Sequence, residues 1–257
     1  MISKKITLLT ALFLLIIFFI ISLTSGPIKI SIKEFFYIVF NQFGFFKNGE
    51  NQLFSNIQES VLLNIRFPRI ILAVLVGAGL GTSGAILQGL FRNPLVDPGF
   101  IGVSSGAAVG AIISIMFGSF LSNFFPSFLL NFLLPFLAVL GSFLTIMLVY
   151  SMSKVDGKTN VMAMLLSGVA INAIAGSVIG FFVSVSSDLE LRSFTFWTMG
   201  GLDNSDWFIV LLVCFFTVIP FLFIFRIRKE IDIFMLGDSE ASNLGVNVEY
   251  LKRKIIL

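Results

Sequence analysis

The stretch that decides the fold is RFPRIILAVLVGAGLGTSGAILQGLFRNPLVDPGFIGVSSGAAVGA, which runs from Arg66 to Ala111. It holds an uncharged run, Ile70–Leu90, then a polar turn with two prolines, and then the start of a second uncharged run. A helix needs roughly 20 apolar residues to cross the hydrocarbon core of a membrane. The pattern therefore predicts two membrane helices joined by a short turn, in which Pro94 and Pro98 end one helix and let the next begin.

The rest of the chain repeats this pattern of long uncharged runs. They are Ile6–Leu23, Gly99–Ser153, Thr159–Ser187 and Trp207–Phe225. Gly99–Ser153 is long enough for two crossings, with a turn expected at Ser122–Ser127. The chain is 57% hydrophobic and only 12% charged, whereas a soluble domain carries about 25% charged residues. We therefore expect an all-α, polytopic membrane protein with six transmembrane helices, in which residues 1–257 form a single transmembrane domain.

The distribution of Lys and Arg predicts the orientation of the chain. If the six spans alternate, eleven of the 17 Lys and Arg residues lie on the same side as the N-terminus. Positive charge favours the cytoplasmic side, so we expect a cytoplasmic N-terminus in the cell (inner) membrane. The first run follows Lys4 and Lys5 and is also compatible with a signal peptide. Its 18 apolar residues and the lack of a small-residue cleavage site favour a retained helix.

Several classes of function are disfavoured by what the sequence lacks. It has no His and a single cysteine, Cys214, so no metal site, disulfide framework or cofactor is expected. GKT at Gly157–Thr159 resembles the end of a phosphate-binding loop, but Met152 stands where that motif needs a glycine. No catalytic constellation indicates an enzyme. The net charge of +3 follows from the orientation rule and does not indicate nucleic-acid binding. No ionisable residue lies inside a predicted span, which disfavours an ion-coupled secondary carrier.

Three segments together carry a family resemblance. They are Arg66–Ala111, then LLSGVAINAI with FWTMGGLDNSDW inside Leu165–Trp207, and MLGDSEASNLGV at Met235–Val246. They resemble the FecCD-type permease subunits of ABC importers for iron–siderophore complexes, haem and vitamin B12. The resemblance covers the chain from about Arg66 onward. Members of that family have ten membrane helices, so the chain resembles an N-terminal portion with six helices and the start of a seventh, truncated at its C-terminal end.

The resemblance implies several partners. A second permease copy would complete a homodimer, with the translocation path between the two copies. Cytoplasmic ATPase subunits would hydrolyse ATP, and an extracytoplasmic substrate-binding protein would deliver the cargo. An ion-coupled secondary carrier and a non-transporting truncated remnant are the alternative interpretations.

The resemblance also implies site residues at both membrane surfaces. Arg66 and Arg69 would bind acidic residues of the docked binding protein, and the planar guanidinium suits carboxylates. A coupling segment at residues 226–254 would carry ATP-driven motion. Its expected ATPase contacts are Leu236, Gly237, Asp238, Glu240, Ala241, Leu244 and Gly245. The local pattern predicts a short helix capped by Asp238 or Ser239 and ended by Gly245, and a second helix capped by Asn247.

A narrow neck of the path is expected near the turn that follows Leu90. Its candidate gate and pathway residues are Asn93, Leu95, Val161, Met162, Ser167 and Asn172. Small residues at helical spacing accompany them, because Gly102, Gly106 and Gly110 would form one line and Gly168 and Gly176 part of another. Such lines let membrane helices approach closely.

Overall fold

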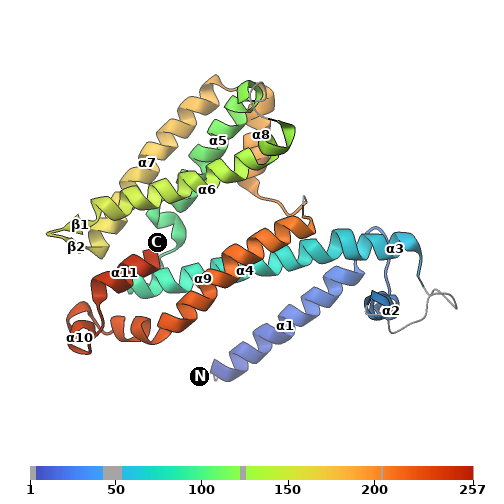
Figure 1. Ribbon diagram of the computed structural model, residues 1–257, viewed down its shortest axis with the longest axis horizontal. Helices are drawn as coiled ribbons and strands as arrows, with labels where there is room; N and C mark the ends of the chain where they lie inside the picture. Colours follow the sequence, from blue (N-terminus) through green and yellow to red (C-terminus); the bar gives the residue numbers. More distant parts are fainter. Residues whose placement is uncertain (1–3, 43–53, 122–125, 204, 257) are drawn as a thin grey trace. The chain divides into compact units, whose positions relative to one another are not determined.

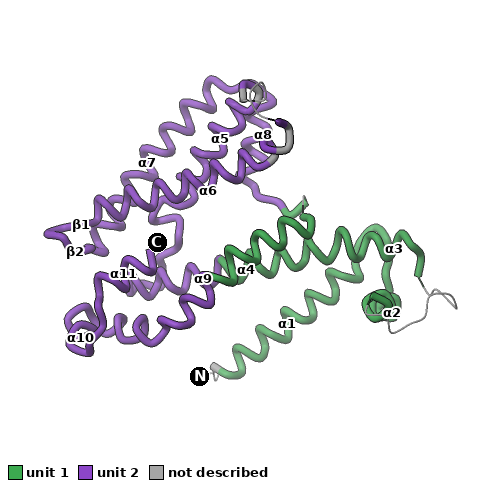
Figure 2. The backbone as a smooth tube through the Cα atoms, in the orientation of Figure 1, with its two compact units in different colours: residues 1–79, 202–219 green, residues 80–201, 220–257 purple. Residues whose placement is uncertain are grey.

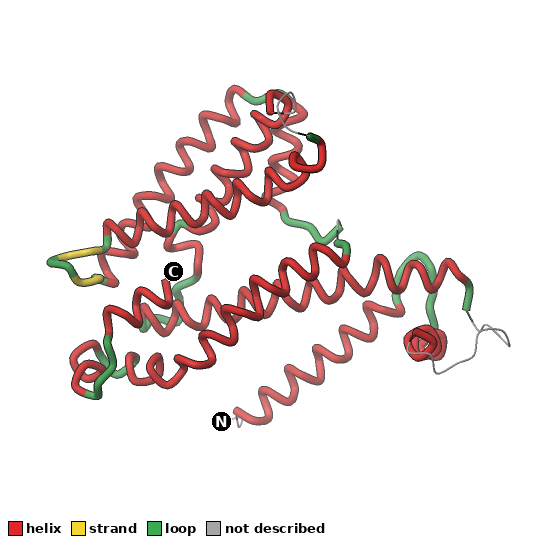
Figure 3. Tube along the Cα trace, viewed as in Figure 1, coloured by secondary structure: helices red, strands yellow, loops and turns green. Residues whose placement is uncertain are grey.

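The computed structural model describes residues 4–42, 54–121, 126–203 and 205–256. Within these ranges the regular secondary structure is helical except for a hairpin of two short strands, and loops join the elements, as Figure 1 and Figure 3 show. Six apolar helices lie where the sequence predicts membrane spans: α1 (Lys4–Thr24), α4 (Phe67–Phe91), α5 (Val103–Leu121), α6 (Ser127–Met152), α7 (Val161–Val185) and α9 (Trp207–Phe234). The expected turn at Ser122–Ser127 falls mostly outside the described residues.

Five of these described helices are long and apolar enough to cross a membrane. The sixth, α5, is the shortest of the six at 19 residues. Shorter elements connect them: α2 (Ile32–Gln42), α3 (Asn56–Val61), the π-helix η1 (Leu62–Arg66), the 3₁₀ helix η2 (Pro98–Ile101), β1 (Lys154–Val155), β2 (Lys158–Thr159), α8 (Asp188–Met199), α10 (Asp238–Asn243) and α11 (Val248–Ile256). The strands pair antiparallel, with Lys154 opposite Thr159.

Contacts divide the chain into two compact units. Unit 1 comprises residues 1–79 and 202–219, and unit 2 comprises residues 80–201 and 220–257, as Figure 2 shows. Both α4 and α9 run from one unit into the other, because the boundaries fall at residues 79–80 and 219–220, inside those helices. Each unit has its own cluster of buried apolar side chains.

Unit 1 is organised around the ends of α1 and α4. Its buried cluster brings together Leu23 of α1, Ile38 of α2, Leu62 of η1 and Ile70 of α4. The helix α2 is amphipathic, because Ile38 is fully buried and Lys33 is exposed. The helix α3 begins with a capping box at Ser55 and continues through η1 into α4 without a break.

Unit 2 contains a tightly packed pair of helices, α5 and α6. A Cβ on Gly110 would lie 2.0 Å from the carbonyl oxygen of Leu137, and a Cβ on Gly141 would lie 2.2 Å from that of Gly106. Only glycine allows these backbones to meet, so the expected close approach along Gly106 and Gly110 is present. Gly102 differs from the expectation: it precedes α5 and ends η2 with a left-handed φ of 83°.

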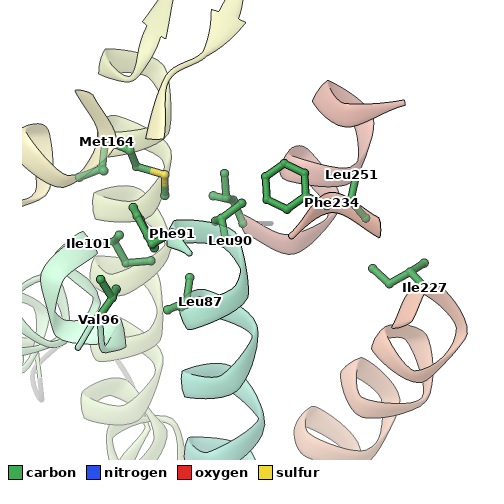
Figure 4. Close-up of a cluster of buried hydrophobic side chains, with 11 residues drawn as sticks. Leu87, Leu90, Phe91, Val96, Ile101, Met164, Ile227, Phe234 and Leu251 are labelled. Carbon is green, nitrogen blue, oxygen red and sulfur yellow. The ribbon is translucent and has the colours of Figure 1, made fainter. Parts of the chain in front are cut away.

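A second buried cluster in unit 2 joins segments that are distant in the sequence. Figure 4 shows Leu87 and Leu90 of α4, Met164 of α7, Phe234 of α9 and Leu251 of α11 in this cluster. Phe234, Met164 and Leu251 are each fully buried. This cluster holds the hairpin end of α7 and the α10–α11 pair against the end of α4.

Candidate functional site

The loop between α4 and α5 has a specific conformation. Arg92 directly follows α4 and has a left-handed φ of 49°, which is uncommon for a residue with a Cβ. The side chain of Asn93 then accepts a hydrogen bond from the backbone N–H of Leu95 (3.0 Å), and Asp97 caps η2 by accepting one from the N–H of Gly99 (2.6 Å). The side chain of Leu95 remains 82% exposed. The loop therefore exposes the side chain of Leu95 on a turn that is held by one carboxamide and one carboxylate.

Asn172 of α7 fixes this loop from the other side. Its Nδ2 donates to the carbonyl oxygen of Gly99 (2.9 Å), and its Oδ1 accepts from the hydroxyl of Ser105 (2.5 Å). One turn earlier, Gly168 leaves no room for a side chain, because a Cβ there would lie 2.0 Å from the carbonyl oxygen of Phe100. Ser167 is buried beside it. In this chain the polar groups of Asn172 hold the loop.

A buried cation lies where the hairpin meets α10 and α11. The side chain of Lys252 is only 3% exposed. Its Nζ donates to Asp238 Oδ2 (2.7 Å), to the carbonyl oxygen of Thr159 (2.9 Å) and to Glu249 Oε1 (3.3 Å). Glu249 in turn accepts, through Oε2, from the backbone N–H of Thr159 (2.8 Å). An ammonium group has three protons to donate, so all of the capacity of Lys252 is used.

Arg92 extends this network to the end of α4. Its Nη2 donates to Asp238 Oδ1 (2.5 Å) and to the carbonyl oxygen of Phe234 (2.8 Å), and the guanidinium carbon lies 4.4 Å from the centroid of the Phe234 ring. Asp238 therefore bridges two cations. We call Arg92, Thr159, Asp238, Glu249 and Lys252 the ion-pair cluster.

The ion-pair cluster shifts the acidity of both of its carboxyl groups in the same direction. Partial burial raises the pKa of Asp238, but hydrogen bonds and charge from Lys252 and Arg92 outweigh it and lower that pKa. For Glu249, partial burial also raises the pKa, and the opposing effect of the Thr159 N–H and of Lys252 leaves it lowered. Both groups are therefore held in their charged form, which balances the two cations.

The α10–α11 pair presents some expected contact residues and hides others. Leu236 and Leu244 are 66% and 61% exposed, and Glu240 is exposed as well. Ala241, by contrast, is fully buried within the chain.

The caps of this pair differ in part from the sequence prediction. Gly237 is the N-cap of α10, with a φ of 134°, and no side chain caps that helix. Asp238 instead begins the helix and binds Lys252 and Arg92. Gly245, with a φ of 86°, follows the end of α10 as expected. Asn247 caps α11 as predicted, by accepting from the N–H of Tyr250 (3.0 Å).

The two arginines expected to dock a binding protein differ in exposure. The side chain of Arg69 is 49% exposed and forms an ion pair with Asp203, which is 85% exposed. Arg66 is only 8% exposed, and its guanidinium donates to the carbonyl oxygens of Leu23 (2.6 Å) and Ile28. Arg66 therefore joins segments within unit 1 through these hydrogen bonds and does not face outward, and only Arg69 keeps the exposure that the docking prediction needs.

The ion-pair cluster was not among the sequence expectations, apart from Asp238. Glu249 and Lys252 stand three residues apart on α11, a spacing that is also common on solvated helix surfaces. Thr159 and Lys252 are 93 positions apart. Only the fold brings these two residues together, and no local pattern in the sequence predicts the contact between them.

Comparison with known proteins identifies the chain's relatives. The model of the FecCD transport family matches residues 14–257. The chain belongs to the FecCD transport family. A solved structure of a metal-chelate type ABC transporter in an inward-facing conformation matches this FecCD chain with a TM-score of 0.77 and 28% identity, over 98% of this chain and 72% of that one. The predicted all-helical, polytopic membrane fold is thereby confirmed.

Curated relatives give the same family at higher identity. The FecCD chain is 39% identical over 200 residues to the hemin transport system permease protein HmuU of Yersinia pestis. It is 38% identical over 192 residues to the cobalamin import system permease protein BtuC of Halobacterium salinarum. These matches cover 77% and 75% of this chain, and 58% and 49% of the relatives. The chain thus spans about half the length of the curated relatives it matches.

Proposed function

We propose that the chain is the membrane-spanning permease subunit of a binding-protein-dependent ABC importer for a metal chelate. The cargo class comprises iron–siderophore complexes, with haem and cobalamin as its other members. Support comes from the family, from the haemin and cobalamin permeases among its relatives, and from the solved metal-chelate type transporter. ATP hydrolysis belongs to separate cytoplasmic subunits in this proposal, because the chain itself has no phosphate-binding motif.

One observation carries the proposal furthest: the α10–α11 pair directly follows the long span α9. One side of the pair is anchored in the protein by Ala241 and Leu251, which are fully buried. The other side exposes Leu236, Glu240 and Leu244. A short, internally anchored helix pair with exposed apolar side chains is suited to fit a cleft on a partner, and in this proposal the partner is the ATPase.

The proposed assembly has two permease copies in the inner membrane, with the N-terminus of each in the cytoplasm as the Lys and Arg distribution favours. The gate near the cytoplasmic surface comprises Leu95 and Met162, which are 82% and 66% exposed, together with Asn93 and Val161. Ser167 and Asn172 support this gate from α7. Docking of the binding protein relies on Arg69. Its ion pair with Asp203 is exposed and contributes about 0–1 kcal/mol, so a carboxylate of the partner can replace it at little cost.

Capture of the ATPase tests the coupling assignment. Leu236→Glu with Leu244→Glu places two charges on the exposed apolar face and leaves the buried side of the pair unchanged. Capture of the ATPase subunit by the purified permease should fall at least about tenfold, because apolar anchors dominate such contacts. The control is Leu189→Glu, because Leu189 on α8 is also a highly exposed leucine (77%). Failure of the wild-type chain to capture any ATPase would refute the proposed function.

Binding-protein docking has a separate test. Arg69→Glu should weaken association of the substrate-binding protein with the permease in proteoliposomes and reduce the dependence of that association on salt. Arg192→Glu, an exposed arginine on α8, is the control for the change in net charge. Unchanged association in the Arg69 variant would remove this residue from the docking surface.

A further inference from the structure

The α11 helix holds the backbone of Thr159 by two points at once. Lys252 donates to the carbonyl oxygen of this residue (2.9 Å), and Glu249 accepts from its N–H (2.8 Å). These are the two hydrogen bonds that a neighbouring strand would make to one residue of a ladder. Two side chains of α11 therefore act as a substitute strand for the end of β2, and Thr159 is only 3% exposed in that position.

The clamped residue directly precedes the start of α7. Asn160 follows Thr159 and caps α7, because its side chain accepts from the N–H groups of Met162 (2.9 Å) and Ala163 (3.0 Å). No flexible linker therefore separates α7 from the two hydrogen bonds that Lys252 and Glu249 make to Thr159, which we call the clamp. A displacement of α11 is therefore transmitted to the first turn of α7, which carries two of the proposed gate residues, Val161 and Met162.

Asp238 links the same cation to α10 and α4. It accepts from Lys252 (2.7 Å) and from Arg92 (2.5 Å), so α10, α11, the hairpin and the end of α4 converge on one charged group. The two cations and two carboxylates of the ion-pair cluster are balanced. Of the four charged side chains only Lys252 is buried, whereas those of Arg92, Asp238 and Glu249 are 36%, 48% and 39% exposed. Withdrawing the ammonium would leave the carbonyl oxygen of Thr159, a residue that is only 3% exposed, without this partner, which is costly. When α10 and α11 are displaced, movement of the whole ion-pair cluster as one body costs less free energy than breaking the contacts of Lys252.

We propose that Lys252 is a positioning residue that transmits movement of the α10–α11 pair to the N-terminal turn of α7 and so to the gate. The inference rests on the proposed function, because it takes the ATPase as the source of that movement. Lys252 does not contact the ATPase or the cargo; it acts through Thr159 and Asp238. Loss of the ammonium disconnects ATP hydrolysis from transport and leaves the exposed surface of α10 in place.

The test measures cargo transported per ATP hydrolysed, with the permease, its ATPase subunits and its binding protein in proteoliposomes. For Lys252→Met we expect ATPase capture and hydrolysis to persist while the transported-to-hydrolysed ratio falls about tenfold, within the range typical of coupling between sites. Lys252→Arg keeps the charge and the donors and should restore most of the ratio. Arg253→Met is the matched control, because Arg253 is exposed on the same helix, and should leave the ratio unchanged.

Hydrogen exchange on the purified permease supplies a readout at the clamp itself. Lys252→Met should speed exchange at Thr159 and in the first turn of α7 more than in α5 or α6. If Lys252→Met does not fold, Glu249→Gln, which keeps the shape and removes one charge, must lower the transport ratio in its place.

Three results overturn the inference. The first is that the wild-type complex transports cargo and Lys252→Met leaves the ratio of cargo transported to ATP hydrolysed unchanged. The second is a parallel fall of transport and hydrolysis, which indicates a general loss of stability. The third is a wild-type chain that neither captures the ATPase nor transports; this outcome refutes the proposed function as well, whereas the first two refute only the role of Lys252.

Discussion

Replacement of Gly168 by alanine tests how tightly α7 is packed on the loop that follows α4. A Cβ at this position would lie 2.0 Å from the carbonyl oxygen of Phe100 and 3.1 Å from the Cα of Ile101. Ordinary contact begins at 3.4 Å, so α7 or η2 would have to move by about 1.4 Å, the difference between these distances. Both obstacles are backbone atoms, and no side-chain rotation can relieve the clash.

The cost of this movement follows from the contacts around it. Overpacking a well-packed contact costs about 1–3 kcal/mol. Asn172 lies one turn after Gly168 on α7. Separation of α7 from η2 would also break the hydrogen bond from Asn172 to the carbonyl oxygen of Gly99, at a further cost of about 1 kcal/mol. Alanine is favoured over glycine in a helix by about 1 kcal/mol, which offsets the second loss. The net destabilisation expected for Gly168→Ala is therefore about 2 kcal/mol.

The assay is the unfolding of the purified protein in detergent, by heat or denaturant, with Gly176→Ala as the matched control. Gly176 lies on the same helix and has no atom within 4 Å of the position of a Cβ. Its replacement should leave stability unchanged or raise it by up to about 1 kcal/mol. Equal unfolding midpoints for the two variants would refute the reasoning, because only the clash distinguishes them.

Three further predictions follow from the polar contacts. Asn172→Leu leaves Ser105 without its carboxamide partner and should cost about 1–3 kcal/mol in the same unfolding assay; an unaffected midpoint would contradict the role given to Asn172. The lowered pKa values of Asp238 and Glu249 mean that the folded state binds fewer protons than the unfolded state, so their stabilisation is fully present above the ordinary values of 3.8 and 4.5 and is lost as the pH falls through the lowered values. Protection of α10 and α11 in hydrogen exchange should therefore decline at acidic pH, and a flat profile would argue against the ion-pair cluster. Ser187→Ala removes the capping box of α8 and should cost about 1 kcal/mol, visible as faster exchange in the first turn of that helix alone.

The sequence predicts the elements whose signals are local. The uncharged run Thr159–Ser187 predicts a span, and α7 occupies Val161–Val185 within it, because an apolar run between polar loops limits the helix at both ends. The cap at Asn247 was also predictable, because a helix cap depends on residues within one turn of the helix end. The family and the fold class followed from segments that are continuous in the sequence.

Contacts between distant segments could not be predicted in this way. Arg66 has the composition and position of an exposed interfacial arginine, and only the fold places the carbonyl oxygens of Leu23 and Ile28 around it. Lys252 likewise has the sequence context of a solvated lysine. The helix α8 was missed because its apolar residues are interrupted by charges, although Ser187 and Glu190 form a capping box that a search for caps would have found.

The π-helix η1 has a consequence for how the length of the chain between α3 and α4 can change. It joins α3 to α4 without interrupting the rod, and each residue added to or removed from such a rod rotates everything beyond it by about 100°. A π turn accommodates one surplus residue. Deletion of a single residue within Leu62–Arg66 would thus restore α-helical winding, while the residues of α3 and of the span keep their angular positions. The angular relation between α3 and α4 is therefore insensitive to a change of one residue in the segment that joins them.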